Sequence, residues 1–182
     1  PVNPTVFKAL KLGYPTAVEG SSTPLDGEKY PLAEIIRYES PARGDMPPVT
    51  LNWYEGGIRP ARPKELEPER RMSDVIYIGE KGALMGHRLI PEARMQEYGA
   101  PPKRLPRSPG QYKEWVDACR GGQPAGSDFV QHSGLLAETV VLGNVAVRAS
   151  KRLEWDGPNF RITNDDAANA YLHREYREGW TL

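Results

Sequence analysis

The 182-residue sequence has a single cysteine, Cys119, and no excess of charge of either sign. One thiol excludes an internal disulfide bond and a metal site built from several cysteines. The 24 basic and 24 acidic side chains give a formal net charge of zero. Because proteins that bind nucleic acid without strong sequence preference present a basic surface, we expect no nucleic-acid partner.

Long apolar runs are absent as well. No stretch approaches the roughly 20 apolar residues that a membrane-spanning helix needs, so we expect no membrane partner. The sequence starts at Pro1 rather than at a methionine, and it shows no signal peptide. The compartment, cytoplasmic or periplasmic, therefore stays open at this stage.

The sequence also lacks the short motifs of common catalytic sites. Despite 18 glycines it contains no dinucleotide loop of the form G-x-G-x-x-G, and no P-loop, H-E-x-x-H or G-x-S-x-G motif is present. His87, His132 and His173 lie far apart without the spacing of metal ligands, so we expect no metal site. From spacing alone, the sequence predicts a domain without a self-contained active site.

What the sequence does contain is a series of short β-rich segments. Apolar and polar residues alternate at 49–54, which predicts a half-buried strand with Val49, Leu51 and Trp53 on one side. Hairpin-length links between most of the predicted strands indicate antiparallel pairing. The other predicted strands lie at 15–21, 33–39, 75–79, 83–85, 153–155 and 160–163.

Helices are predicted mainly in the last third of the chain. Ser108-Pro109 is a helix-start signal, and the residues after it place Cys119 on an apolar stripe with Tyr112 and Trp115, so we expect Cys119 in the core. Further helices are predicted at 4–12, with Asn3 as N-cap and Gly13 as the stop, at 92–98 and at 165–176.

The segment 133–150 is apolar almost all round, which predicts a helix that is buried on most sides against a sheet. Glu138 interrupts it, and a carboxylate there is costly unless it is paired. Arg148, Lys151 and Arg152 are the candidate partners.

Strands first and helices later predict an α+β fold, with a single, mostly antiparallel or mixed sheet and helices packed on one face. The length suits one domain that spans residues 1–182. If Tyr38, Trp53 and Tyr54 point to the other face of the sheet, that face needs cover.

Three places are candidates for ligand contact. His132 lies just before the predicted helix 133–150, where backbone N–H groups favour an anionic or carbonyl group, or it is a capping or packing histidine. His87, followed by Arg88, is either a loop side chain or part of a pocket wall. The run 53–57 (WYEGG) is either a ligand platform or a plain strand end with surface aromatics.

The C-terminal third resembles the end of Gfo/Idh/MocA-type oxidoreductases. The family pattern around P-L-x-E-x-V-L-L-G-N-V-A is matched at Leu136, Glu138 and 143–146, and the following L-E-W-D, T-N and E-Y-R elements are matched at 153–156, 163–164 and 175–177. Upstream, the segments NWYEGG (52–57), GEKGALMG (79–86), 108–125 and 4–20 resemble the family's strand end, hairpin and helices.

The resemblance implies that the chain is the C-terminal substrate and oligomerisation domain of an NAD(P)-dependent oxidoreductase. The substrate would be a sugar, sugar derivative or polyol, and the likeness implies a homo-oligomer assembled through the sheet face. NAD or NADP would be bound mainly by an N-terminal Rossmann domain of the same protein, which is missing from this sequence. This chain alone is expected to bind no cofactor and to be inactive.

For this reading, the substrate-contacting candidates come from three segments: Trp53, Tyr54, Glu55, His87, Arg88 and His132. None of them is expected to be catalytic. The alternative is a stand-alone ligand-binding or assembly module that kept the fold without the chemistry.

Overall fold

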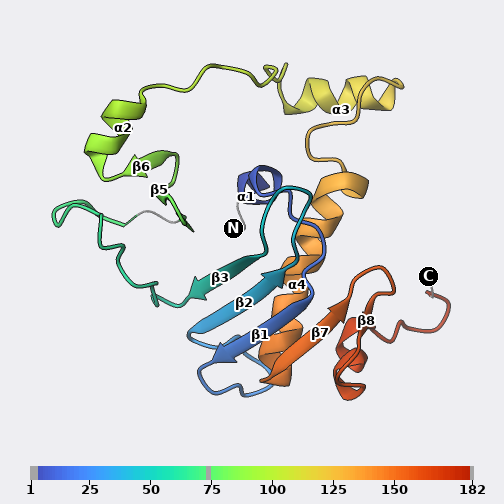
Figure 1. Cartoon of the computed structure of the whole chain (residues 1–182). Coiled ribbons are helices and arrows are strands. Elements are labelled where there is room, and N and C mark those ends of the chain that lie inside the picture. The colour runs from blue at the N-terminus through green and yellow to red at the C-terminus, as the bar shows by residue number, and fades with distance from the viewer. Residues whose placement is uncertain (1–3, 73–74, 181–182) are drawn as a thin grey trace. The chain divides into compact units, whose positions relative to one another are not determined.

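The protein has an α+β fold with two antiparallel sheets (Figure 1). The structure is a computed structural model that describes residues 4–72 and 75–180. The chain divides into two compact units: a large unit, 1–59 with 109–182, and a small unit, 60–108. The α+β class is confirmed, but the strands form one five-stranded and one three-stranded sheet rather than a single sheet.

The large unit is built on the five-stranded sheet, whose strand order is β3-β2-β1-β7-β8 with antiparallel neighbours throughout. The first and last parts of the chain therefore meet where β1 pairs with β7. The strands are β1 (Ala17–Ser22), β2 (Glu34–Ser40), β3 (Val49–Glu55), β7 (Arg152–Asp156) and β8 (Arg161–Ile162).

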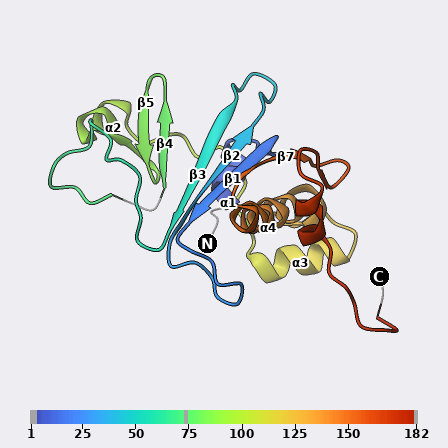
Figure 2. The same ribbon diagram turned by 90° about the horizontal axis from the view of Figure 1, so that it is seen from below.

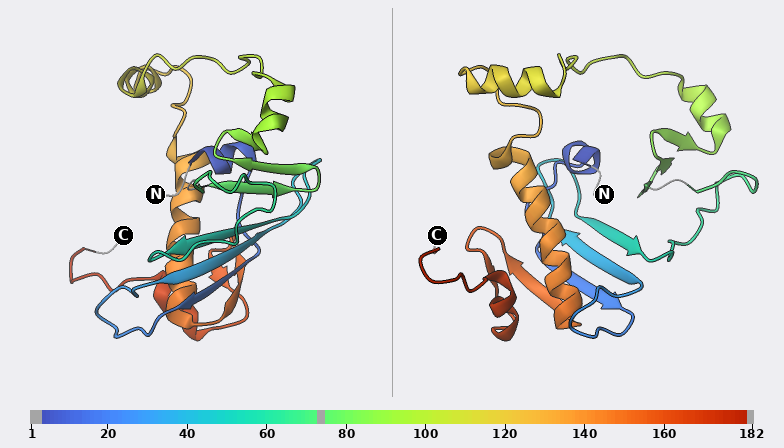
Figure 3. Two further views of the ribbon diagram at one scale, coloured as in Figure 1. Left: turned by 90° about the vertical axis from the view of Figure 1, so that its left-hand side faces the viewer. Right: turned by 180° about the vertical axis from the view of Figure 1, so that it is seen from behind.

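One long helix, α4 (Gly134–Ala149), covers one face of this sheet, as Figure 2 and Figure 3 show. Its apolar surface packs on Val18, Ile36 and Leu153, all of which are buried. Gly20 of β1 makes the close approach possible, because a Cβ there would lie 2.5 Å from the backbone nitrogen of Val147. The helix predicted at 133–150 is confirmed in position and in its burial against the sheet.

The pairing of β2 with β3 decides which side chains face α4. Tyr38 lies opposite Leu51, and Trp53 lies opposite Ile36, so all four share the helix-covered face. Tyr38 is only 6% exposed. The expectation that Tyr38 and Trp53 point to the open face is therefore wrong, and only Tyr54 does so.

The open face of the sheet is polar. Glu39 on β2 forms ion pairs with Arg37 (3.6 Å) and with Arg152 of β7 (2.9 Å). Arg152 is also 3.2 Å from Glu154 on its own strand. The ion pair between Glu39 and Arg152 thus connects β2 with β7 across this face, over the intervening strand β1.

The C-terminal segment differs from its prediction. Instead of a helix over 165–176, a 3₁₀ helix, η2 (Ala167–Leu172), is followed by irregular chain at 173–177. The Asn169 side chain bonds both the N–H (2.8 Å) and the carbonyl (2.9 Å) of Ile162, and Asp165 accepts from the N–H of Ala167 at 3.1 Å. Such side-chain bonds to backbone compete with α-helix formation.

Two further helices belong to the large unit. The helix α1 (Pro4–Ala9) is shorter than predicted, and its predicted N-cap, Asn3, lies outside the described residues. The helix α3 (Gln111–Cys119) buries none of its residues, and Cys119 is exposed. The prediction of a core cysteine is wrong, because the apolar stripe of α3 faces outward, with Trp115 66% exposed.

The small unit contains a three-stranded antiparallel sheet in the order β4-β5-β6. The predicted hairpin is present, and a third strand that the sequence did not indicate extends it. The elements are β4 (Ile76–Gly79), β5 (Gly82–Met85), β6 (Arg88–Ile90) and the helix α2 (Glu92–Tyr98). The core of this unit consists of Leu66, Ala83, Met85 and Ile90.

Candidate functional site

A π-helical turn, η1 (Phe129–Ser133), leads directly into α4. Asp128 caps it: one carboxylate oxygen accepts from the N–H of Val130 (3.0 Å) and of Gln131 (2.8 Å). A Cβ on Gly134 would lie 2.4 Å from the carbonyl oxygen of Phe129, so the wide turn depends on glycine at this position. Short π-helical turns of this kind occur frequently at functional sites.

The turn exposes an apolar side chain and buries a polar one, the reverse of the usual distribution. Val130 is 87% exposed, whereas His132 is only 9% exposed. The Nε2 atom of His132 is buried and has no hydrogen-bond partner within the described part of the chain. An unpaired buried polar group costs about 1–3 kcal/mol. Burial of this imidazole therefore lowers the free energy of unfolding.

His132 lines a pocket of about 470 Å³ between α1 and the segment 124–131. This volume lies within the range of small-ligand sites, roughly 300–1,000 Å³. The walls carry charged, amide and apolar groups together, among them Phe7, Lys8, Lys11, Asp128 and Gln131. The large unit supplies every lining residue.

The end of α1 shapes the other wall. The chain reverses through two backbone bonds, Leu12 N–H to Phe7 O (2.9 Å) and Lys11 N–H to Lys8 O (3.2 Å). Lys11 takes the left-handed conformation (φ 49°) that this motif usually gives to glycine. The helix thus ends before Gly13, the predicted stop, and the turn residue faces the pocket.

A chain of contacts fixes the loop between α3 and η1 to α1. Lys8 Nζ donates to the carbonyl oxygen of Gly126, and the N–H of Gly126 donates to Glu114 Oε2 at 3.1 Å. The loop that forms this wall of the pocket is therefore bonded both to α1 and to α3.

The structure also corrects the reason for which His132 was singled out. The N–H groups at the start of the combined helix are taken by Asp128, and His132 lies inside the first turn rather than ahead of it. These N–H groups are therefore not available to bind an anion, as the prediction for the N-terminus of α4 required. His132 is instead a candidate site residue because it is buried in the wall of the pocket.

The run 53–55 divides between the two sides of β3. Trp53 packs against the core beneath α4, Tyr54 lies on the open face, and Glu55 is exposed opposite Glu34. Neighbouring residues of a strand point to opposite faces, so Trp53 and Tyr54 do not form one platform.

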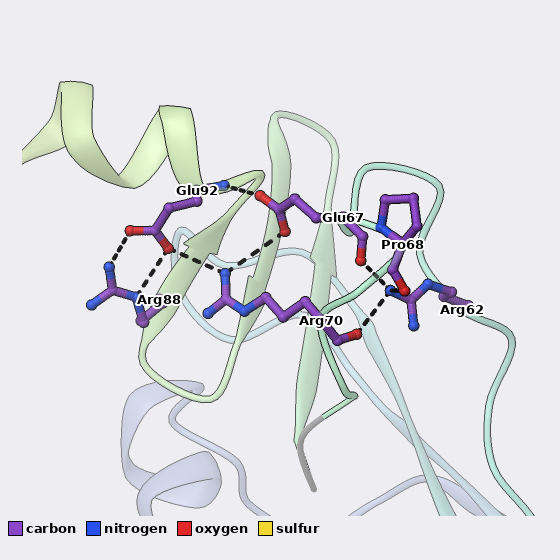
Figure 4. Close-up of polar contacts among 6 residues, drawn as sticks. All are labelled: Arg62, Glu67, Pro68, Arg70, Arg88 and Glu92. Carbon is purple, nitrogen blue, oxygen red and sulfur yellow. Dashed lines mark hydrogen bonds and ion pairs between the residues drawn. The ribbon is translucent and has the colours of Figure 1, made fainter.

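His87 and Arg88 belong to the small unit. His87 is exposed in the turn between β5 and β6. Arg88 is paired with the carboxylate of Glu92, which also accepts from Arg70 at 3.2 Å (Figure 4). The guanidinium of Arg88 is thus part of an ion-pair network that connects β6 with α2.

The same network holds the segment 60–72 in place (Figure 4). Glu67 accepts the backbone N–H of Glu92, a bond that lowers the pKa of the Glu67 carboxyl. Arg62 donates to three backbone carbonyls, including that of Arg70 at 2.8 Å. These contacts give Arg62, Glu67 and Arg70 structural roles within the segment.

A second buried polar group, which the sequence reasoning did not identify, lies at the start of β2. Glu34 is 3% exposed, and its Oε2 has no hydrogen-bond partner within the described residues. Burial, and then the nearby charge of Glu55, raises the pKa of Glu34. Burial likewise raises the pKa of Tyr38. The sequence signal was an acidic residue in phase with Ile36 and Tyr38.

Glu138 has a partner other than the predicted cations. The indole Nε1 of Trp155 donates to Glu138 Oε1 at 3.1 Å, and burial raises the pKa of this carboxyl. Glu138 therefore connects α4 with β7 within the core of the large unit.

No protein-family model matches the chain, and no curated protein matches it. The resemblance to Gfo/Idh/MocA-type oxidoreductases therefore rests on the residues quoted above. Across residues 4–72 and 75–180, no group of three or more His, Cys, Asp and Glu side chains is arranged to hold a metal ion. In the same ranges, no helix is both long and apolar enough to cross a bilayer.

Proposed function

We propose that this chain is the substrate-binding and assembly part of an NAD(P)-dependent oxidoreductase that acts on a sugar, sugar derivative or polyol. The observation that carries the proposal is the pocket beside the π-helical turn, with buried His132 in its wall. The resemblance of the C-terminal third to Gfo/Idh/MocA-type enzymes supports it. In this proposal a separate Rossmann domain of the same protein binds the dinucleotide.

The composition of the pocket suits a polyhydroxylated ligand. Sugar hydroxyls both donate and accept hydrogen bonds, and the walls offer ammonium donors, the amide of Gln131 and the carboxylate of Asp128. Phe7 and Leu12 add apolar surface for the carbon skeleton. The chain would bind and orient the substrate, while the hydride acceptor is held elsewhere.

Calorimetric titration of the purified chain tests this division of labour. We expect a monosaccharide or polyol to bind and NAD or NADP to bind weakly or not at all. His132→Ala should abolish sugar binding, whereas His173→Ala, an exposed histidine outside the pocket, should not. Submicromolar binding of a dinucleotide would show that the nucleotide site has been misplaced.

A stand-alone binding module is the second candidate, and one observation favours it: all pocket walls come from the large unit of this chain. The two candidates differ in the reading frame that encodes the protein. An in-frame upstream segment with G-x-G-x-x-G and E-K-P motifs favours the enzyme. A start codon and ribosome-binding site directly before Pro1 favours the module.

For the assembly role, we propose that a second copy of the chain packs on the open face of the sheet. Light scattering should then detect at least a dimer, and Tyr54→Glu on that face should shift it toward monomer. Trp53→Glu should instead destabilise the fold, because Trp53 packs beneath α4. A monomer at high protein concentration would contradict this interface.

A further inference from the structure

We infer that the pocket beside His132 takes an anionic ligand, one that carries a carboxylate or phosphate group. The sugar part of this inference rests on the proposed function. Together the two give an acidic or phosphorylated sugar as the ligand.

The charges in the pocket wall carry the inference. Two ammonium groups, Lys8 and Lys11, line it together with one carboxylate, Asp128. The same oxygen of Asp128 accepts two backbone N–H groups of η1, so this carboxylate is directed to the protein's own backbone. Glu114, whose Oε2 accepts the N–H of Gly126, is not among the lining residues. The wall itself has an excess of positive charge.

The lysines are not required to cap α1. Of the last four carbonyl groups of the helix, those of Val6, Phe7 and Lys8 already accept backbone N–H groups. Lys8 Nζ makes one bond, to the carbonyl of Gly126, which leaves further donors of its ammonium group. Among the hydrogen bonds and ion pairs of the described residues, none involves Lys11 Nζ. Both side chains therefore retain donors for a ligand.

The backbone at Lys11 is a second, independent observation. A side chain in the left-handed conformation is strained, and glycine is the usual residue at this place of the motif. Strained conformations of this kind cluster at ligand sites. A lysine here, with its side chain at the pocket, fits a role in ligand contact better than a role in ending the helix.

His132 provides the third observation. Its Nε2 is buried in the pocket wall and has no hydrogen-bond partner among the residues that the structure describes. A ligand oxygen that reached this nitrogen from the pocket would supply a hydrogen-bond partner for it. Charge-assisted hydrogen bonds from the ammonium groups of Lys8 and Lys11 to carboxylate or phosphate oxygens would be about twice as strong as neutral ones.

The test is a set of calorimetric titrations of the full chain with inorganic phosphate, gluconate, glucose 6-phosphate and glucose. We expect the two charged sugars to bind at least about tenfold more tightly than glucose, with an affinity that falls as salt is added. Tighter binding of gluconate identifies the carboxylate as the preferred group, and tighter binding of glucose 6-phosphate identifies the phosphate.

The variant Lys11→Gly distinguishes a role of Lys11 in ligand binding from a role in stabilising the fold. It removes the ammonium group and puts glycine where the backbone favours it, so Tm should rise by about 2–4 °C while anion affinity falls about tenfold. Ser150→Gly is the matched control, because Ser150 has the same backbone conformation (φ 52°) after α4 and does not line the pocket. It should raise Tm and leave the affinity unchanged.

Glucose binding as tight as that of the charged sugars, unaffected by Lys11→Gly, would overturn the anionic class and leave the proposed function standing. Phosphate binding that depends on Lys11, without binding of any sugar, would support the anion site and overturn the proposed function. Absence of binding in all four titrations would overturn both.

Discussion

The two compact units of this chain are stabilised by different means. The large unit has a core cluster of eleven buried residues between α4 and the five-stranded sheet. The small unit has a cluster of four, supplemented by the network of arginines and glutamates around Glu92. Apolar burial contributes far more per residue than partly exposed ion pairs do. The small unit should therefore be the less stable of the two and the more sensitive to salt.

The largest expected effect comes from the core of the large unit. Leu153 is fully buried beneath α4, and Leu153→Ala should lower the free energy of unfolding by about 2–5 kcal/mol. Urea denaturation followed by circular dichroism measures the change. Leu32→Ala, at a leucine that is 87% exposed in the same unit, is the matched control and should change stability by less than about 0.5 kcal/mol. Equal effects of the two variants would contradict the described core.

A matching substitution in the small unit should act locally. Ile90 is fully buried there, and Ile90→Ala should destabilise that unit by about 2–4 kcal/mol. Amide hydrogen exchange should show lost protection in 60–108, with α4 and the five-stranded sheet unaffected. If protection fell equally across the whole chain, the two units would have to unfold together.

Glu34→Gln should raise stability by about 1 kcal/mol at pH 8, because it removes a buried charge with one oxygen that has no partner among the described residues. The folded-state pKa of Glu34 is raised, so above the unfolded value of about 4.3 the folded state holds the proton more tightly than the unfolded state does. Wild-type stability then falls as pH rises through the raised pKa, and the variant lacks this slope.

Thermal melts of both proteins between pH 4 and pH 8 measure this difference. Glu55→Gln, at the exposed partner position, removes only the smaller of the two causes and should flatten the slope less. Parallel pH profiles for wild type and Glu34→Gln would show that Glu34 does not titrate in this range.

The smallest effect is expected at the ion-pair network. Glu92→Gln leaves Arg70 and Arg88 without their shared carboxylate, which is about one-third exposed, at a cost of about 1 kcal/mol or less. The difference should disappear in about 1 M NaCl, where screening acts within about 3 Å. Lys113→Gln, in an exposed pair of α3, should have no measurable effect. A cost for Glu92→Gln that persists in high salt would indicate packing rather than charge.

Much of the large unit could be predicted from the sequence, because its strands alternate and its central helix is apolar. Alternation shows that Val49, Leu51 and Trp53 share a side, but it does not show which side is covered. That depends on the pairing with β2 and on the position of α4, which are tertiary facts. The face of Trp53 and Tyr38 was therefore predicted wrongly although the strands themselves were right.

The pocket could be predicted only in part. His132 was singled out from its place before a helix, yet Lys8 and Lys11 come from the far end of the sequence and meet it only in the folded chain. The π-helical turn has no hydrophobic period of its own, and its local signs are the capping residue Asp128 and Gly134. The C-terminal helix was predicted wrongly because Asn169 and Asp165 bond the backbone in ways that periodicity does not represent.

The glycine of β1 beneath α4 has a consequence at the opposite end of that helix. Gly20 lets the backbone around Val147 rest directly on the strand, which fixes the C-terminal half of a rod about 24 Å long. A methyl group at position 20 would push the C-terminal half of α4 away from the sheet. The resulting tilt of the helix would displace His132 near its N-terminal end. Small changes far from the cavity should thus be felt there as displacement, since a stiff helix transmits tilt along its length.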